Sequence, residues 1–192
     1  GGVRRVAEII RPAAPGSYAA ALFVHWYEPE AHYSNRTQFV EQAKELARRG
    51  VISLLVETMW SDRDWFYKRT QADDIANSMQ QLAELRQALD LLLAEPGVDP
   101  RRVAYIGHDF GAMYGVLLGA ADPRPSCYVL MAGTPRFPDW YLYYPRLPEA
   151  ERAAFRASFA PHDPIAQIGR LAPAPLLFQF GTSDPHVPAE RA

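Results

Sequence analysis

The clearest chemical signal in the chain is Gly107-His108-Asp109-Phe110-Gly111, which joins an apolar stretch that begins near Arg102 to a helical pattern that reaches Leu118. This is a strand, a sharp turn and a helix, with a glycine two residues to either side of Asp109. Flanking glycines let the chain fold back without a Cβ clash, so the central side chain sits in a strained turn above the end of a strand. Open α/β sheets bind their ligands at that end. The spacing therefore predicts a catalytic Asp109.

A second carboxylate follows the apolar run at residues 174–180. Asp184 stands in a short polar segment just after that run, so we expect it one loop away from Asp109. No group of metal-ligating residues has the spacing of a zinc site, and the turn is not a phosphate loop. We therefore expect neither a metal nor an organic cofactor.

Continuous apolar runs predict the strands that carry these residues. Such runs are typical of strands buried on both faces of a parallel sheet, and they occupy residues 18–24, 51–56, 127–131 and 174–180, with an earlier edge strand within residues 1–12. Helical spacing follows from Thr37 to Gly50, and again from Ile75 until Glu95-Pro96-Gly97. The alternation predicts an α/β fold, a mostly parallel sheet with helices on both faces.

Between the last two runs, residues 134–169 form a connection several times longer than usual. Long insertions of this kind are usually functional, and this one is rich in aromatic residues. We predict a short helical lid over the site, in which Asp163-Pro164 begins a helix.

Length and composition indicate an ordinary globular chain. It has 192 residues, 48% of them hydrophobic and 22% charged, with a net charge of −2. These values favour one domain over residues 1–192 and argue against a nucleic-acid partner. No signal peptide or membrane-spanning run stands out, and the single cysteine, Cys127, excludes an internal disulfide, so we expect a cytoplasmic location. The expected partner is a small-molecule substrate, and a homodimer stays open.

The turn resembles the nucleophile elbow of the α/β-hydrolase superfamily, with aspartate where that motif usually carries serine. Within the superfamily, Gly-His-Asp-x-Gly resembles the haloalkane and haloacetate dehalogenases and the epoxide hydrolases. The run LLLAEPGVDPRRVAYIG and the segment PAPLLFQFGTSDPHVP are similar to dienelactone-hydrolase-like proteins. The resemblance implies the order nucleophile, acid, histidine along the chain. Asp184 takes the acid position, and we expect the histidine in residues that follow Ala192.

Five histidines stand within the sequence itself. His186 is too near Asp184 to be oriented by it in the usual way, and His108 should point away from Asp109 because side chains alternate along a strand. His25, His32 and His162 lie in the loop that faces the turn or in the lid. None of them fits the role of general base well, and His32 and His162 fit it least badly.

The resemblance also implies the surroundings of the nucleophile. The backbone amides of Trp26 and Phe110 take the positions of the oxyanion hole, although Trp26 and Tyr27 have packing of their loop as an alternative role. Aromatic or polar side chains from the loops and the lid would hold the substrate and its leaving group, with hydrophobic packing as the alternative. The expected pocket residues are His25, Tyr27, Glu57, Trp60, Trp140, Tyr141, Tyr143 and Tyr144.

An aspartate nucleophile favours one reaction over another. Attack on an ester carbonyl would form an anhydride, whereas attack on a saturated carbon forms an ordinary alkyl ester that water can cleave. The sequence thus predicts a hydrolase of epoxides or haloalkanes. Two alternatives stay open: a carboxylester or lactone hydrolase of the dienelactone type, and a binding protein that has lost its chemistry.

Overall fold

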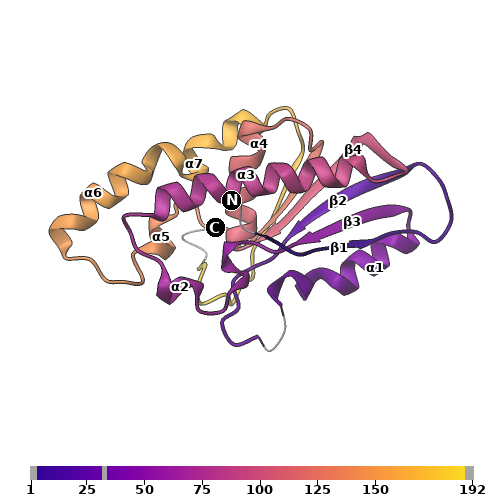
Figure 1. Ribbon diagram of the computed structural model, residues 1–192. Coiled ribbons are helices and arrows are strands. Elements are labelled where there is room, and N and C mark those ends of the chain that lie inside the picture. Colours follow the sequence, from indigo (N-terminus) through magenta and orange to yellow (C-terminus); the bar gives the residue numbers. More distant parts are fainter. Residues whose placement is uncertain (1–3, 32–33, 189–192) are drawn as a thin grey trace.

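The computed structural model describes residues 4–31 and 34–188. Its six strands form one twisted sheet in the order β1-β3-β2-β4-β5-β6 (Figure 1). Only β1 runs antiparallel to its neighbour, and the other pairs are parallel. The strands are β1 (Ala7–Ile10), β2 (Tyr18–Val24), β3 (Val51–Val56), β4 (Val98–His108), β5 (Cys127–Met131) and β6 (Leu176–Gln179).

The apolar runs of the sequence became the strands of the sheet. The bounds of β2, β3 and β5 coincide with the predicted runs, and β6 occupies the middle of the run at 174–180. Alternate residues of β2 enter separate clusters of the core. Leu22 and Val24 pack on one face of the sheet, and Ala21 and Phe23 pack on the other.

Helices cover both faces, as Figure 1 shows. Helix α3 lies across one face together with α4, and α1 lies along the opposite face. Among the described residues, no helix is long and apolar enough to cross a membrane. The helices of the body are η1 (Asn35–Phe39), α1 (Val40–Arg48), η2 (Met59–Ser61), α2 (Trp65–Lys68), α3 (Asp74–Ala94) and α4 (Phe110–Ala121).

The long connection after β5 is helical, as predicted. It contains α5 (Pro138–Tyr141), α6 (Glu149–Phe159), η3 (Ala160–His162) and α7 (Pro164–Gln167), and η4 (Ile168–Leu171) completes the path to β6. Figure 1 shows that α6 extends away from the sheet, beyond α2 and α5. The insertion therefore reaches well past the elbow instead of lying over it along its whole length.

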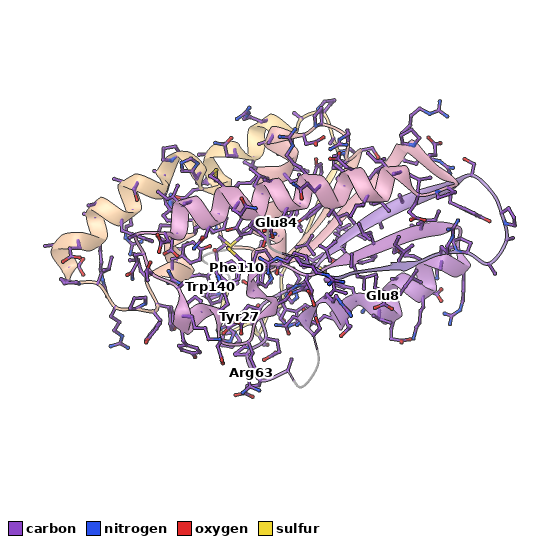
Figure 2. The ribbon with its side chains drawn as sticks, viewed as in Figure 1. Glu8, Tyr27, Arg63, Glu84, Phe110 and Trp140 are labelled. Carbon is purple, nitrogen blue, oxygen red and sulfur yellow. The ribbon has the colours of Figure 1, made fainter. Side chains whose placement is uncertain are left out.

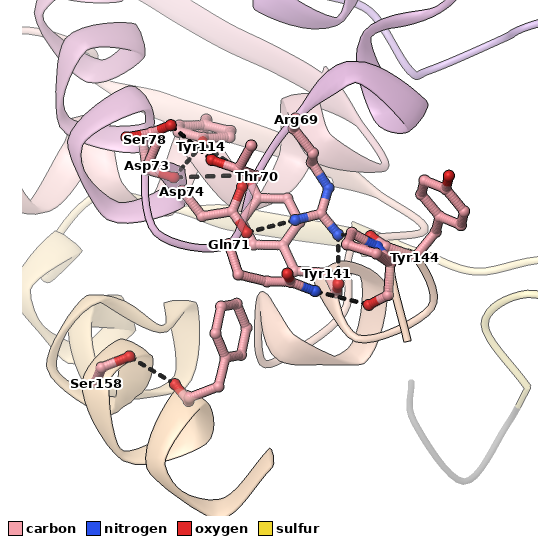
Figure 3. A network of polar contacts seen from close by, with 12 residues as sticks. Arg69, Thr70, Gln71, Asp73, Asp74, Ser78, Tyr114, Tyr141, Tyr144 and Ser158 are labelled. Carbon is pink, nitrogen blue, oxygen red and sulfur yellow. Dashed lines mark hydrogen bonds and ion pairs between the residues drawn. The ribbon is translucent and has the colours of Figure 1, made fainter. Parts of the chain in front are cut away.

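One buried arginine ties this insertion to the body (Figure 3). Arg69, which follows α2, pairs with Asp74 at the start of α3 and donates to the backbone carbonyls of Tyr141 and Tyr144. The neighbouring Gln71 donates to the carbonyl of Pro145 at 2.6 Å. These contacts hold α5 and the turn that follows it against the loop between α2 and α3.

Candidate active site

Asp109 occupies the turn that the glycine spacing predicts. It lies between β4 and α4 with φ 55° and ψ −119°, a conformation that non-glycine residues rarely adopt. A Cβ on Gly107 would overlap the carbonyl of Gly111, and a Cβ on Gly111 would overlap the carbonyl of Val24. The Asp109 amide donates to the carbonyl of Met131 at 2.8 Å, which fixes the turn to β5. The surrounding packing therefore holds the strained backbone of the elbow.

The two carboxylate oxygens of Asp109 have different surroundings. Oδ2 accepts the backbone N–H of Tyr27 at 3.3 Å, and the Phe110 amide also favours the ionised form. Oδ1 is buried and has no hydrogen-bond partner among the described residues. One oxygen is thus held by the Tyr27 amide, while the other has no described partner.

Burial raises the pKa of Asp109 to about 7. The Tyr27 and Phe110 amides oppose that shift because they stabilise the charge, and the carboxylate of Asp184 adds to it because like charges repel. A carboxyl group with this pKa is close to half ionised at neutral pH. Groups tuned in this way are common in active sites.

The elbow opens into a pocket of about 540 Å³. Carboxylates, two histidines and aromatic rings from several separate loops converge there. The lining consists of Trp26, Tyr27, Glu28, Pro29, Glu30, Phe66, Tyr67, His108, Asp109, Phe110, Ala132, Trp140, Tyr143, Asp184, His186 and Val187. Figure 2 shows Tyr27, Phe110 and Trp140 close together beneath α3.

Asp184 reaches the same pocket from the loop after β6. Its Oδ1 accepts the backbone N–H groups of His186 at 2.8 Å and Val187 at 3.1 Å, and these donors lower its pKa. The structure therefore brings the two predicted carboxylates to one pocket. Asp109 is the one with a raised pKa and Asp184 the one that stays ionised.

Two histidines that the sequence argument set aside also line the pocket. His108 packs edge-on against Trp26 with ring centroids 4.8 Å apart, and burial lowers its pKa. The His186 ring lies 5.9 Å from that of Trp140. The alternation of side chains predicts that His108 points away from Asp109 only where the strand is regular. His108 is the last residue of β4, where the chain turns sharply. In the described part of the chain, no imidazole nitrogen hydrogen-bonds to Asp109 or Asp184. His32 lies outside the described residues.

The Trp26 amide, which was predicted to lie beside the nucleophile, does not face Asp109. The Trp26 N–H donates to the side-chain oxygen of Gln38 at 3.0 Å, so the next amide, that of Tyr27, faces Asp109. Gln38 is held in place because it also donates to Asn35 at 3.2 Å. The Phe110 amide stands at the start of α4, as predicted, where helix N–H groups lack helical partners.

Three predicted pocket residues belong to the core instead. His25 is 1% exposed and bonds through Nδ1 to the carbonyl of Trp26 and through Nε2 to Ser61, each at 2.8 Å. Burial lowers the pKa of His25 to about 4, so it stays neutral. Trp60 is fully buried and donates to the His25 carbonyl at 3.0 Å. Tyr141 is fully buried too, with its hydroxyl 3.2 Å from that of Tyr114.

Two more predicted pocket residues lie outside the described lining. Glu57 accepts the backbone N–H of Val6 at 2.9 Å and lies 3.9 Å from Arg36, so it braces the edge of the sheet. Tyr144 is exposed and packs against Tyr67. Trp140 and Tyr143 are the residues of the insertion that reach the pocket.

The pocket could hold a ligand without a metal site. Within the described residues, no three His, Cys, Asp or Glu side chains are placed to bind a metal ion. What the site offers is a carboxylate with one free oxygen, two backbone amides beside it, a second carboxylate and aromatic walls.

Comparison by sequence gives no match to a protein-family model or to a curated protein. Comparison by structure finds similar folds. A crystal structure of 2,6-dihydroxy-pseudo-oxynicotine hydrolase has a TM-score of 0.70 at 16% identity, and the match covers 97% of this chain and 52% of that one. Acetyl xylan esterase from Paenibacillus sp. R4 has a TM-score of 0.61 at 15% identity, covering 94% and 73%.

A third match is named for the fold itself. The alpha/beta hydrolase GrgF from Penicillium sp. sh18 has a TM-score of 0.63 at 13% identity, and the match covers 98% of this chain and 84% of that one. The chain spans about half the length of the pseudo-oxynicotine hydrolase. Identities this low carry over the fold and no activity. The comparisons confirm the α/β-hydrolase fold that the elbow and the alternation of strands and helices predict.

Proposed function

We propose that this chain carries the catalytic elbow of a hydrolase in which Asp109 attacks a saturated carbon, as in an epoxide or a haloalkane. The observation that carries the proposal is the difference between the two oxygens of Asp109. Oδ2 is held by the Tyr27 amide, and Oδ1 is buried without a partner at the apex of the elbow. A nucleophilic carboxylate needs this arrangement, because one oxygen must be fixed while the other forms a bond.

In the first step, a lone pair of Oδ1 forms the bond to carbon. The bond from that carbon to the halogen or to the epoxide oxygen breaks, and its electron pair leaves with the halide or the alkoxide. The negative charge thereby moves from Asp109 to the leaving group. Trp140 lines the pocket, and its indole N–H is buried without a partner among the described residues. It is the donor that we assign to the leaving atom.

In the second step, water attacks Cγ of the alkyl ester. Oδ2 takes up the negative charge, and the amides of Tyr27 and Phe110 stabilise it as an oxyanion hole. Collapse of the intermediate breaks the bond from Cγ to the alkyl oxygen, releases the alcohol and restores Asp109, with one water consumed. One proton of the water goes to a base, for which the resemblance implies a histidine oriented by Asp184, and the other goes to the departing alkyl oxygen. With an epoxide, the proton on the base then neutralises the alkoxide formed in the first step.

A second candidate function rests on the raised pKa of Asp109. A carboxyl group with a pKa of about 7 is suited to take a proton from water at neutral pH. Water activated by Asp109 could then attack an ester carbonyl whose oxygen is bound by the two amides. The esterase among the structures of similar fold favours this alternative.

Covalent trapping separates the two functions. The protein is incubated with styrene oxide or 1-bromohexane, and its intact mass is measured before peptide mapping. We expect one adduct on Asp109. The peptide that contains Asp163 is an internal control, because Asp163 is also buried with a raised pKa but lies outside the pocket.

An ester assay completes the test. If no adduct forms and Asp109→Asn abolishes turnover of p-nitrophenyl acetate, Asp109 is a general base. If ester turnover survives Asp109→Asn and no adduct forms, both functions assigned to Asp109 are wrong. A single turnover in ¹⁸O-labelled water adds independent evidence, because only the nucleophile mechanism transfers the label into the Asp109 carboxylate.

A further inference from the structure

The acids that line the pocket differ from several other acids of the protein in having no ion-pair partner. Glu28, Glu30, Asp109 and Asp184 all line it, and none of the four forms an ion pair with a described residue. Elsewhere, buried acids such as Asp74 and Asp122 pair with arginines. Among the described lining residues there is no lysine or arginine. The pocket therefore combines four acids with no permanently charged cation among those residues, and its basic groups are the imidazoles of His108 and His186 near Asp184.

Two basic side chains close to Tyr27 in sequence or space, Arg63 and Lys68, are paired with other acids. Tyr27 reaches the rim through its hydroxyl, which donates to the carbonyl of Arg63 at 2.5 Å, and Figure 2 shows Arg63 beyond Tyr27. The guanidinium of Arg63 lies 3.8 Å from Asp64. Lys68 contacts Asp62 at 3.2 Å and Asp64 at 3.3 Å. These cations are occupied by acids of their own loop.

Aromatic rings make up much of the remaining wall. A cation is attracted to the face of an aromatic ring within about 6 Å of its centroid, and the attraction grows when water is excluded. The lining rings are those of Trp26, Tyr27, Phe66, Tyr67, Phe110, Trp140 and Tyr143.

This protein already uses one of these rings to hold a cation. The guanidinium carbon of Arg69 lies 4.9 Å from the ring centroid of Phe66 and 4.5 Å from that of Tyr141. Phe66 lines the pocket as well. The aromatic rings around Phe66 can thus contact a positive group on the side where Arg69 lies and on the side of the pocket.

From the unpaired carboxylates and the aromatic wall, we infer that the pocket binds a substrate that carries a cationic amine or alkylammonium group. The aromatic faces hold the positive group, Glu28 and Glu30 balance its charge at the rim, and the reacting carbon lies toward Oδ1 of Asp109. This assignment of a substrate class rests on the proposed function, because it takes this pocket as the place of reaction.

Two alkylating reagents of the same shape test the inference. (2-Bromoethyl)trimethylammonium and 1-bromo-3,3-dimethylbutane differ in one atom, the charged nitrogen that replaces a quaternary carbon. The rate of Asp109 alkylation is measured by intact mass, and each rate is divided by the rate of the same reagent with free acetate. We expect the cationic reagent to react about tenfold faster after this correction.

Variants identify the origin of the preference. Glu28→Gln combined with Glu30→Gln is expected to reduce the preference to about threefold, since neutral side chains of the same shape remain and only the rim charge is lost. Glu151→Gln is the matched control, because Glu151 is an exposed acid of α6 outside the pocket. Raising the salt concentration should weaken the preference in the parent protein.

Failure of this inference can be told apart from failure of the proposed function. If both reagents alkylate Asp109 at equal corrected rates, the proposed substrate class is wrong, and Asp109 is still supported as the nucleophile. If neither reacts, the nucleophile is wrong, and calorimetric binding of choline against 3,3-dimethylbutan-1-ol decides the substrate class. Tighter binding of choline then supports the class, and equal binding overturns it.

Discussion

Two aspartates of this protein lie among aromatic rings and differ in their partners: Asp74 is buried in the core, whereas Asp109 is partly buried, with its Oδ1 inside. Asp74 is 2% exposed and pairs with Arg69, which is itself stacked on Phe66 and Tyr141. Asp109 has the Tyr27 amide as the described donor to Oδ2 and no described partner at Oδ1. Burial raises the pKa of both carboxyl groups, and only at Asp74 does an arginine oppose that shift.

The difference contrasts a carboxylate that an ion pair fixes in the core with one that has no cation beside it. At Asp74 the charge is matched by a cation that also holds the backbone of the insertion (Figure 3). Removing either partner would leave the other one buried and alone. At Asp109 no cation matches the charge, which lowers the free energy of unfolding. The packing of the rest of the sheet offsets this loss. The following predictions test this contrast.

The largest expected effect is on the reaction. Asp109→Asn keeps the shape of the side chain but removes the nucleophilic oxygen, so we expect adduct formation and turnover to fall by about 10⁴-fold or more. Because the variant also removes an unpaired buried charge, its melting temperature at pH 8 should not fall. Activity is followed by intact mass and stability by thermal unfolding. A variant that both unfolds and loses activity would mean that Asp109 has a structural role like that of Asp74.

The next effect is on stability. Arg69→Met leaves Asp74 as an uncompensated buried carboxylate and should lower the free energy of unfolding by about 3–5 kcal/mol. Adding Asp74→Leu should recover part of the loss, since an apolar pair of similar volume replaces the ion pair. Urea unfolding measures both. A double variant that is less stable than Arg69→Met alone would show that Asp74 stabilises the fold without its arginine.

A third effect separates the two carboxylates by pH. Alkylation requires ionised Asp109, so its rate should rise about tenfold per pH unit below pH 7 and level off above it. The folded-state pKa of Asp109 is raised from 3.8 to about 7, so its neutral form favours folding. That contribution is complete below pH 3.8 and is lost as the pH rises through 7. The stability of Asp109→Asn relative to the parent should therefore grow between pH 4 and 7.

The pH experiment has a clear contrary outcome. If the alkylation rate does not change between pH 5 and 8, the nucleophile has an ordinary carboxyl pKa and burial does not control it. The Asp74 variants provide a control, because a residue that only stabilises the fold should not move the midpoint of the rate profile.

Much of the fold could be predicted from local patterns, and the contrast between the two aspartates only in part. Buried parallel strands require unbroken apolar runs, so β2, β3 and β5 could be read directly from the sequence. The elbow could be predicted because close backbone approach at Gly107 and Gly111 leaves no room for a side chain.

Other features depend on tertiary partners that no local pattern reveals. Gln38 accepts the Trp26 N–H across a loop, so the Tyr27 amide is the one that donates to Asp109. Arg69 lies in a polar stretch like many surface arginines, and only the fold places it beside Asp74. The polar and aromatic composition of the loop after β2 predicts pocket residues. His25 belongs to this loop, but tertiary packing buries it in the core.

The smallest predicted effect concerns the leaving group. Trp140→Phe keeps an aromatic ring against Phe110, whose centroid is 6.1 Å away, but removes the indole N–H that has no described partner. Loss of one hydrogen bond to the developing bromide should slow alkylation by 1-bromohexane about tenfold. Trp65→Phe is the matched control, since Trp65 also packs on Phe110 and lies outside the described lining. Equal slowing in both variants would mean that Trp140 acts through packing, as the aromatic rings around Asp74 do, and that a different donor serves Asp109.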